Sequence, residues 1–143
     1  MKYGGLFALA KPLAQIMAGA WPEWEHKPDA ILPIPLHRRR QRRRGFNQSA
    51  LLAVHLGRQL DIPVNQQAMK RVRHTNPQTG LSPKDRLENV RGAFLADSRL
   101  VDNKQILLID DVYTTGATMS AAAGALLASG AAGVSAFCLA RTV

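Results

Sequence analysis

Two adjacent carboxylates, Asp110 and Asp111, stand between an apolar run and a turn rich in hydroxyl groups. The turn consists of Thr114, Thr115, Gly116, Ala117 and Thr118. Its backbone N–H groups and hydroxyls can converge on one small anion, and the start of a following helix favours a phosphate there. Carboxylates would repel that phosphate, but they accept hydrogen bonds from the hydroxyls of a sugar that carries it. The pattern therefore predicts a site for a ribose 5-phosphate.

The same residues have a plainer interpretation, a buried strand followed by an acidic turn and a threonine-capped helix. Asp-Asp and Thr-Thr pairs are common in turns, so neither half of the motif is specific by itself. The complete frame over residues 106–118 is much rarer, and we favour the ligand site. The frame is not a nucleotide P-loop, because no Gly-Lys-Ser/Thr follows it.

Alternating strands and helices must position this site. The apolar patterns predict strands over residues 30–36, 68–72, 92–96, 105–109 and 133–140. They predict helices over residues 5–20, 48–60, 82–90 and 117–129. The run 105–109 is apolar throughout, as in a strand that is buried on both faces. This order is typical of an α/β fold with a central, mostly parallel sheet flanked by helices.

Length and composition limit the classes of protein. The chain has 143 residues, 46% of them hydrophobic, which is enough for one domain with a true core. We expect an N-terminal helical or hood segment over residues 1–27 and the main domain over 28–143. No apolar run could span a membrane and no secretion signal is recognisable, so we expect a cytoplasmic protein without membrane insertion. The single cysteine, Cys138, excludes an internal disulfide and is expected to be buried.

The positive charge is concentrated in the middle of the chain. The formal net charge is +9, and residues 31–100 hold 14 of the 19 Lys and Arg but 4 of the 10 Asp and Glu. Six arginines fall in the predicted loop His37–Arg44. Such a stretch indicates a polyanionic partner, which leaves nucleic acid, polyphosphate and phosphorylated metabolites open.

The frame over residues 106–118 resembles the phosphoribosyl-pyrophosphate fingerprint of type I phosphoribosyltransferases. The wider pattern is similar to the ComF family of competence and DNA-utilisation proteins. Four further blocks carry that similarity, namely Ile-Pro-Leu-His at 34–37, Arg-Gly-Phe-Asn-Gln at 44–48, Arg71-x-Arg73-x-Thr75-x-x-Gln78, and Arg86-x-x-Asn89. The resemblance covers residues 28–143. Many ComF-like proteins also carry an N-terminal cysteine zinc module, which is not found in this chain.

The resemblance implies a type I phosphoribosyltransferase fold that binds phosphoribosyl pyrophosphate with Mg²⁺. Asp110 and Asp111 would form the catalytic pair on the ribose hydroxyls, and residues 114–118 would hold the 5-phosphate. The metal would be held through ligand oxygens and water, with no direct protein ligand. The pyrophosphate would meet His37, Arg38 and Arg44, and a flexible loop with Arg71, Arg73, Gln78 and Arg86 would close over the ligand.

The acceptor of the phosphoribosyl group is left open. Purine-salvage relatives have an aspartate where this chain has Thr114, which argues against purine salvage. A second hypothesis is a non-catalytic DNA-uptake module that binds single-stranded DNA, or a protein of the uptake machinery, through the arginines. A steep salt dependence of DNA binding, lost when Arg39, Arg40, Arg42 and Arg43 become Ser, would favour it. A third is a sensor that binds phosphoribosyl pyrophosphate without turnover.

Overall fold

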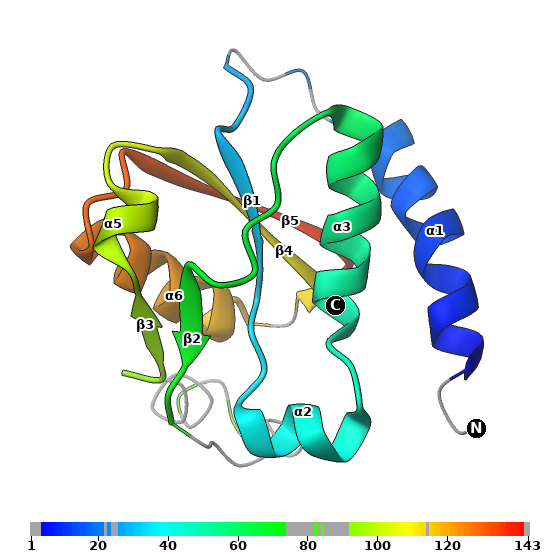
Figure 1. Cartoon of the computed structure of the whole chain (residues 1–143), viewed down its shortest axis with the longest axis horizontal. Coiled ribbons are helices and arrows are strands. Elements are labelled where there is room, and N and C mark those ends of the chain that lie inside the picture. Colours follow the sequence, from blue (N-terminus) through cyan, green and yellow to red (C-terminus); the bar gives the residue numbers. More distant parts are fainter. Residues whose placement is uncertain are drawn as a thin grey trace.

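A parallel sheet forms the centre of the computed structural model, which describes residues 4–21, 23, 26–73, 82, 84, 92–113 and 115–141. Its strands are β1 (Ala30–Pro33), β4 (Gln105–Tyr113) and β5 (Gly133–Arg141), in the order β1-β4-β5. An isolated parallel bridge between Ile31 and Val64 adds a further segment beside β1. The three strands cross the middle of Figure 1.

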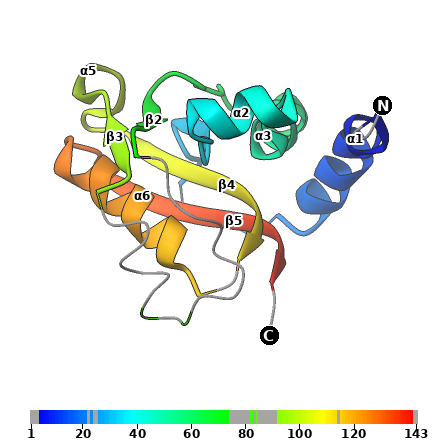
Figure 2. The ribbon, with the colours of Figure 1, turned by 90° about the horizontal axis from the view of Figure 1, so that it is seen from below.

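Helices cover both faces of this sheet, as Figure 2 shows. The helices α1 (Gly4–Gly19) and α3 (Gln48–Leu60) lie on one side, and α6 (Ala117–Ala128) lies on the other. An antiparallel pair of short strands, β2 (Met69–Arg71) and β3 (Phe94–Ala96), stands beside α6. The predicted α/β architecture with a parallel sheet between helices is therefore confirmed.

The central strand β4 is buried on both faces. Leu107 and Ile109 pack in the cluster that includes residues of α1 and α3. Ile106 and Leu108 pack in the second cluster, with residues of α6, β2 and β3. All four side chains are at most 2% exposed. An uninterrupted apolar run suits such a strand, because alternate side chains enter different cores.

The strand β4 is longer than predicted. The sequence suggests an end at residue 109, but the strand continues through Asp110 and Asp111 to Tyr113. Aspartate disfavours strands by itself. Here β5 pairs with β4 along its length, up to Tyr113 opposite Arg141, so the ladder outweighs the local preference.

The predicted arginine loop is a helix, α2 (Arg38–Arg44). Arginine favours helices, although repulsion between neighbouring arginines opposes one. Both ends are capped: His37 Nδ1 accepts a hydrogen bond from the Arg39 N–H at 3.2 Å, and Gly45, with φ +82°, donates its N–H to Gln41 O at 2.7 Å. The prediction of a loop was wrong because the hydrophobic periodicity that identifies helices is missing here.

The remaining elements are close to the predicted ranges, with three exceptions. The strand β1 ends at Pro33, three residues before its predicted end. The helix α5 (Ser98–Val101) was not predicted; Asp97 caps it by accepting from the Arg99 N–H at 3.0 Å. The helix predicted over residues 82–90 lies mostly outside the described residues.

The N-terminal helix α1 packs against α3. Ala14 and Met17 are buried in the same cluster as Leu56. The division into segments 1–27 and 28–143 stays a prediction. In the part of the chain that the structure describes, no helix has both the length and the apolar character that crossing a membrane would need.

Candidate functional site

The two acids of β4 are held by the first turn of α3. Ser49 Oγ donates a hydrogen bond to Asp110 Oδ1 at 2.8 Å, and Gln48 Nε2 donates one to Asp111 Oδ2. Ser49 is only 4% exposed. The acids follow the buried part of β4, at the carboxyl edge where open α/β sheets bind ligands.

Asn47 fixes the start of α3 in this position. Its Oδ1 accepts from the N–H groups of Ser49 at 3.0 Å and Ala50 at 3.4 Å, and its Nδ2 donates to Ile34 O at 3.1 Å. The buried ring of Phe46 precedes it. Asn47 therefore caps the helix and ties it to the chain just after β1.

The contacts of Gln48 and Ser49 with the acids were missed by sequence reasoning. The two residues precede the acids by 63 and 61 positions respectively. The Arg-Gly-Phe-Asn-Gln block contains Gln48, and this was the available signal. Only the packing of α3 on the sheet shows which groups it faces.

Partial burial makes Asp110 electrostatically unusual. Desolvation raises the pKa of Asp110 to about 7, the neighbouring Asp111 adds to the rise, and the Ser49 hydroxyl opposes it. Cys138 lies opposite Asp110 in β5, and burial together with the two acids raises the pKa of its thiol to about 11. Cys138, which the sequence led us to expect in a buried position, is half-buried. A carboxyl group that titrates near neutral pH can exist in both forms at the site.

The turn after β4 leads directly into α6. Ala117 N–H donates to Thr115 Oγ1 at 3.3 Å, and Gly116, with φ +82°, is the N-cap residue of α6. This left-handed φ favours glycine, and a Cβ on Gly116 would also lie 2.9 Å from Cζ of Tyr113. Thr118 is half-buried in the first turn, and Thr114 lies outside the described residues.

A buried arginine, Arg71, ends β2 and interacts electrostatically with Asp110. Arg71 is 8% exposed, and its guanidinium lies 5.3 Å from the centre of the Phe94 ring. Burial and the charge of Arg40 lower the pKa of Arg71, and the charge of Asp110 opposes them. The apolar pattern predicts a strand over residues 68–72, whereas the family resemblance implies a flexible loop at Arg71. Arg71 is the last residue of β2, because its pairing with Phe94 continues the β2–β3 ladder.

Of the other residues of that predicted loop, the structure describes Arg73. Arg73 is exposed, two positions beyond the end of β2. Gln78 and Arg86 lie outside the described residues.

The residues predicted to bind the pyrophosphate lie on α2 or cap it. Arg44 is half-buried at the end of the helix, and its Nη1 donates to Gln48 Oε1 at 2.9 Å. Arg38 is exposed, and His37 caps the helix. The structure therefore brings Arg44 toward the acid pair through Gln48 and leaves Arg38 on the surface.

The described residues contain no group of three His, Cys, Asp or Glu that could enclose a metal ion. The two acids are oxygen donors, which suit Mg²⁺, and their carboxylates already accept hydrogen bonds from α3. Such a site fits a magnesium ion that keeps most of its ligands from a bound phosphate compound and water.

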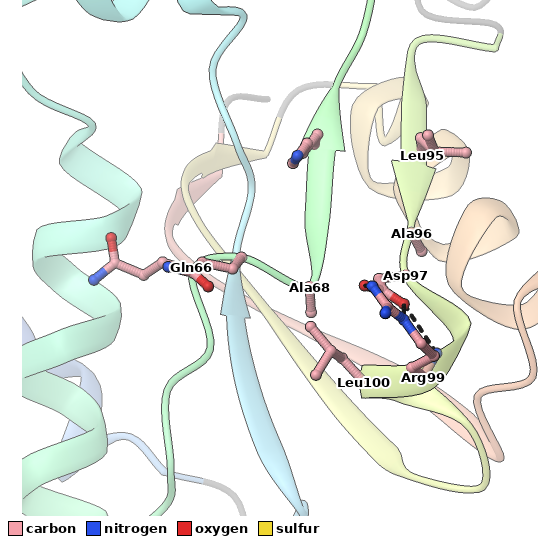
Figure 3. A pocket seen from close by; sticks show the side chains of 9 residues that line it. Gln66, Ala68, Leu95, Ala96, Asp97, Arg99 and Leu100 are labelled. Carbon is pink, nitrogen blue, oxygen red and sulfur yellow. Dashed lines mark hydrogen bonds and ion pairs between the residues drawn. The ribbon is translucent and has the colours of Figure 1, made fainter.

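A separate cavity of about 900 Å³ lies beside β2 and β3. Figure 3 shows its lining, which includes Ala68, Leu95 and the ion pair between Arg99 and Asp97 at 2.8 Å. It lies toward the end of β2 away from Arg71, and none of the residues predicted to bind ligand lines it.

Comparison with known families decides the wider assignment. Residues 46–142 match the phosphoribosyl transferase domain. This chain belongs to that family. The matched region includes the acid pair, the turn after it and all of α3.

Relatives of this phosphoribosyltransferase domain are competence and DNA-utilisation proteins of the ComF/YhgH family, as predicted. Competence protein F of Haemophilus influenzae is 50% identical over 95 residues, which cover 65% of this chain and 42% of that protein. DNA utilization protein YhgH of Escherichia coli is 42% identical over 116 residues, covering 81% and 51%. Competence protein ComFC of Bacillus subtilis is 39% identical over 115 residues, covering 78% and 44%. The chain spans about half the length of these curated relatives.

Solved structures support the type I phosphoribosyltransferase fold of the domain. The glutamine phosphoribosylpyrophosphate amidotransferase of B. subtilis superposes with a TM-score of 0.63 at 19% identity, over 93% of this chain and 26% of that one. The adenine phosphoribosyltransferase of Leishmania donovani has a TM-score of 0.55 at 16% identity, over 92% and 52%. At these identities the likeness concerns the fold alone.

Proposed function

We propose that this domain binds phosphoribosyl pyrophosphate with Mg²⁺ at the carboxyl edge of β4 and transfers the phosphoribosyl group to an acceptor, in a cellular role in DNA uptake or utilisation. One observation carries the proposal: Asp110 and Asp111 are fixed by α3 directly before the Thr115–Thr118 turn, in a chain of this family. The use of a phosphorylated metabolite fits the cytoplasmic location expected from the sequence.

The turn is the proposed 5-phosphate site. The first turn of an α-helix offers N–H groups that its own backbone leaves free, and its dipole favours an anion. Gly116 brings the backbone close to the ligand, and Thr115 and Thr118 add hydroxyl donors beside Thr114. The ribose then extends toward the acids.

The acids are the proposed ribose site. Ionised carboxylates accept hydrogen bonds from the two ring hydroxyls, and these charge-assisted bonds orient the anomeric carbon. Mg²⁺, when bound with the ligand, supplies charge neutralisation for the pyrophosphate. Arg44, bonded to Gln48 beside Asp111, and Arg71, whose charge interacts with that of Asp110, add positive charge for the same leaving group.

In the proposed transfer, the bond between the anomeric carbon and the pyrophosphate oxygen breaks, and its electron pair leaves with the pyrophosphate. A lone pair of the acceptor forms the new bond to that carbon. An N–H or O–H acceptor then loses its proton to water. The role of this chain is to hold the sugar in place and to stabilise the departing charge.

The exposed face of α2 supports a second candidate function, the binding of single-stranded DNA. The arginines exposed there are Arg38, Arg39, Arg42 and Arg43. They attract a phosphate backbone without a specific geometry. Arg40, grouped with them from the sequence alone, is half-buried and its charge acts on Arg71, so we leave it out of the exposed group.

Calorimetric titration of phosphoribosyl pyrophosphate into the protein, with and without Mg²⁺, tests the first function. We expect stoichiometric, Mg²⁺-dependent binding. Pyrophosphate release that saturates with an acceptor would establish transfer, and binding without release would indicate a sensor. No binding, together with salt-sensitive binding of single-stranded DNA, would overturn the proposal in favour of the second candidate.

A further inference from the structure

Gln48 lies between two groups of opposite charge that come from different elements. Arg44 Nη1, at the end of α2, donates to Gln48 Oε1 at 2.9 Å. On the other side, Gln48 Nε2 donates to Asp111 Oδ2 in β4. A continuous chain of hydrogen bonds thus links the arginine helix with the acid pair.

The amide is the chemical group that such a link requires. It has a carbonyl oxygen that accepts and an NH₂ group that donates, so it can serve a guanidinium and a carboxylate at once. If the amide were reversed, its oxygen would face the carboxylate of Asp111 and its NH₂ would face the guanidinium of Arg44. Both contacts would then be repulsive, so the two neighbours fix one orientation of the amide.

The backbone around Gln48 is fixed as well. Asn47 caps α3 and bonds to Ile34 O at 3.1 Å, and Gly45 turns the chain between α2 and α3. Next to Gln48, Ser49 holds Asp110 at 2.8 Å. The first turn of α3 is therefore placed firmly against both acids, and side-chain freedom at Gln48 is small.

We infer that Gln48 is a positioning residue, which orients Asp111 for ligand and couples it to Arg44. This inference rests on the proposed function, because it assigns Asp111 to the ribose and Arg44 to the pyrophosphate of the same ligand. A movement of Arg44 toward a bound anion changes the hydrogen bond on the Gln48 oxygen, and through the amide it changes the setting of Asp111. The two ends of the ligand are in this way recognised together.

Two substitutions at Gln48 separate this role from simple packing. Gln48→Ala removes both hydrogen bonds. Gln48→Glu keeps the shape and the bond from Arg44, but it places a carboxylate against Asp111. We expect each variant to weaken binding of Mg²⁺–phosphoribosyl pyrophosphate by about 10- to 100-fold at about pH 8, the usual range for a hydrogen bond to a charged group. The control Gln41→Ala, on the exposed face of α2, should bind within about twofold of the wild type.

The pH dependence of the Gln48→Glu variant gives the sharper result. A protonated glutamic acid again has one acceptor for Arg44 and one donor for Asp111. The charged groups around it are Arg44 from α2 and Asp111, with Asp110 beside it, from β4. The ratio of the Glu variant's Kd to the wild-type Kd should fall toward one near about pH 5.5, whereas the ratio for Gln48→Ala should not change. A ratio for Gln48→Glu that is independent of pH would overturn the inference.

A measurement without ligand separates this inference from the proposed function. The side-chain amide NMR signal of Gln48, assigned by its loss in Gln48→Ala, should shift in both Arg44→Ala and Asp111→Asn. It should not shift in Asp61→Asn, at the far end of α3. If it shifts as expected but the wild type binds no phosphoribosyl pyrophosphate, the proposed function fails and the link stands. If neither substitution moves the signal, the inference is wrong whatever the ligand.

Discussion

The acid pair and the arginine helix α2 lie near the same edge of the sheet, but their surroundings differ. Asp110 and Asp111 of β4 are half-buried beside the first turn of α3, and each accepts a hydrogen bond from that turn. Four of the six arginines of α2 are exposed to water, and none of the six is fully buried. The carboxylates are therefore partly shielded from water and fixed by hydrogen bonds, whereas most arginines of α2 are solvated.

This difference separates two kinds of recognition. A buried charge interacts strongly with its neighbours, so its position and protonation are set by named groups. An exposed charge is screened within about 10 Å at moderate salt, and it attracts polyanions without fixing their geometry. The acid pair thus suits one small ligand, and the exposed arginines suit any nearby polyanion.

The largest expected effect comes from neutralising the acid pair. Asp110→Asn with Asp111→Asn should weaken binding of phosphoribosyl pyrophosphate by at least about 100-fold, because two charge-assisted hydrogen bonds to the ribose are lost. Calorimetry measures the affinity, and circular dichroism should show an unchanged fold. The control Asp61→Asn retains the left-handed conformation that this position has, φ +53°, and should bind normally. Unchanged affinity in the double variant would refute the assignment of the ribose site.

The single substitution Asp110→Asn should make the folded protein more stable, relative to the wild type, as the pH rises. The folded-state pKa of Asp110 is about 7, above the ordinary 3.8, so between these values the folded protein binds a proton that the unfolded chain has lost. The free energy of unfolding therefore falls as the pH rises through this window, by an amount on the order of 1 kcal/mol for each unit of pH. Asparagine does not titrate, so the free energy of unfolding of the variant does not show this fall.

Thermal unfolding between about pH 5 and pH 8 measures the effect. We expect the difference in Tm between Asp110→Asn and the wild type to become more positive as the pH rises. A difference that is constant with pH would show that Asp110 is already ionised at low pH, and that burial has less influence on the pair than we infer.

Substitutions of the exposed arginines of α2 should weaken the binding of single-stranded DNA. Arg39, Arg42 and Arg43 are exposed and are not assigned to the ligand. Replacing all three by Ser should lower the slope of log K against log salt for single-stranded DNA by about 2, and the affinity by about tenfold at low salt. Binding of phosphoribosyl pyrophosphate should change by less than about twofold, because exposed charges are screened. If the triple variant loses both activities together, the two regions are not separate.

The sequence predicted the regular part of the molecule, and the location of the ligand site stays a prediction. Strand β4 and helix α3 were predicted because apolar residues recur with the strand or helix period, and burial enforces those periods. The Asp-Asp and Thr-Thr-Gly-Ala-Thr frame is local, so it was recognisable without a structure.

Two kinds of feature were missed: a helix without an apolar face, and contacts between residues that are distant in the sequence. The helix α2 has no apolar face, and its capping by His37 and Gly45 gives only a weak signal in sequence. The contacts of Gln48 and Ser49 with the acids join segments that are more than sixty residues apart. The burial of Arg71 beside Phe94 likewise depends on the pairing of β2 with β3.

The smallest expected effect concerns Gly116, in the turn between β4 and α6. A second glycine within α6, Gly124, serves as a matched control. Gly116 has φ +82°, and a methyl group there would meet the ring of Tyr113. Gly124 lies inside α6, where an added Cβ meets nothing within 4 Å. Gly116→Ala should therefore lower the free energy of unfolding by about 1 to 2 kcal/mol, whereas Gly124→Ala should raise it by about 0.5 to 1 kcal/mol.

Urea unfolding measures both changes, and titration with phosphoribosyl pyrophosphate distinguishes their causes. Because Gly116 opens the turn proposed for the 5-phosphate, its substitution should also weaken ligand binding, even when the fraction of folded protein is held constant. Gly124→Ala should leave the affinity unchanged, since its methyl group faces solvent. If Gly116→Ala bound ligand normally after losing stability, the turn would be needed to join β4 to α6 but not to hold the phosphate. The residues that bind the ligand would then be limited to the acid pair and the first turn of α3.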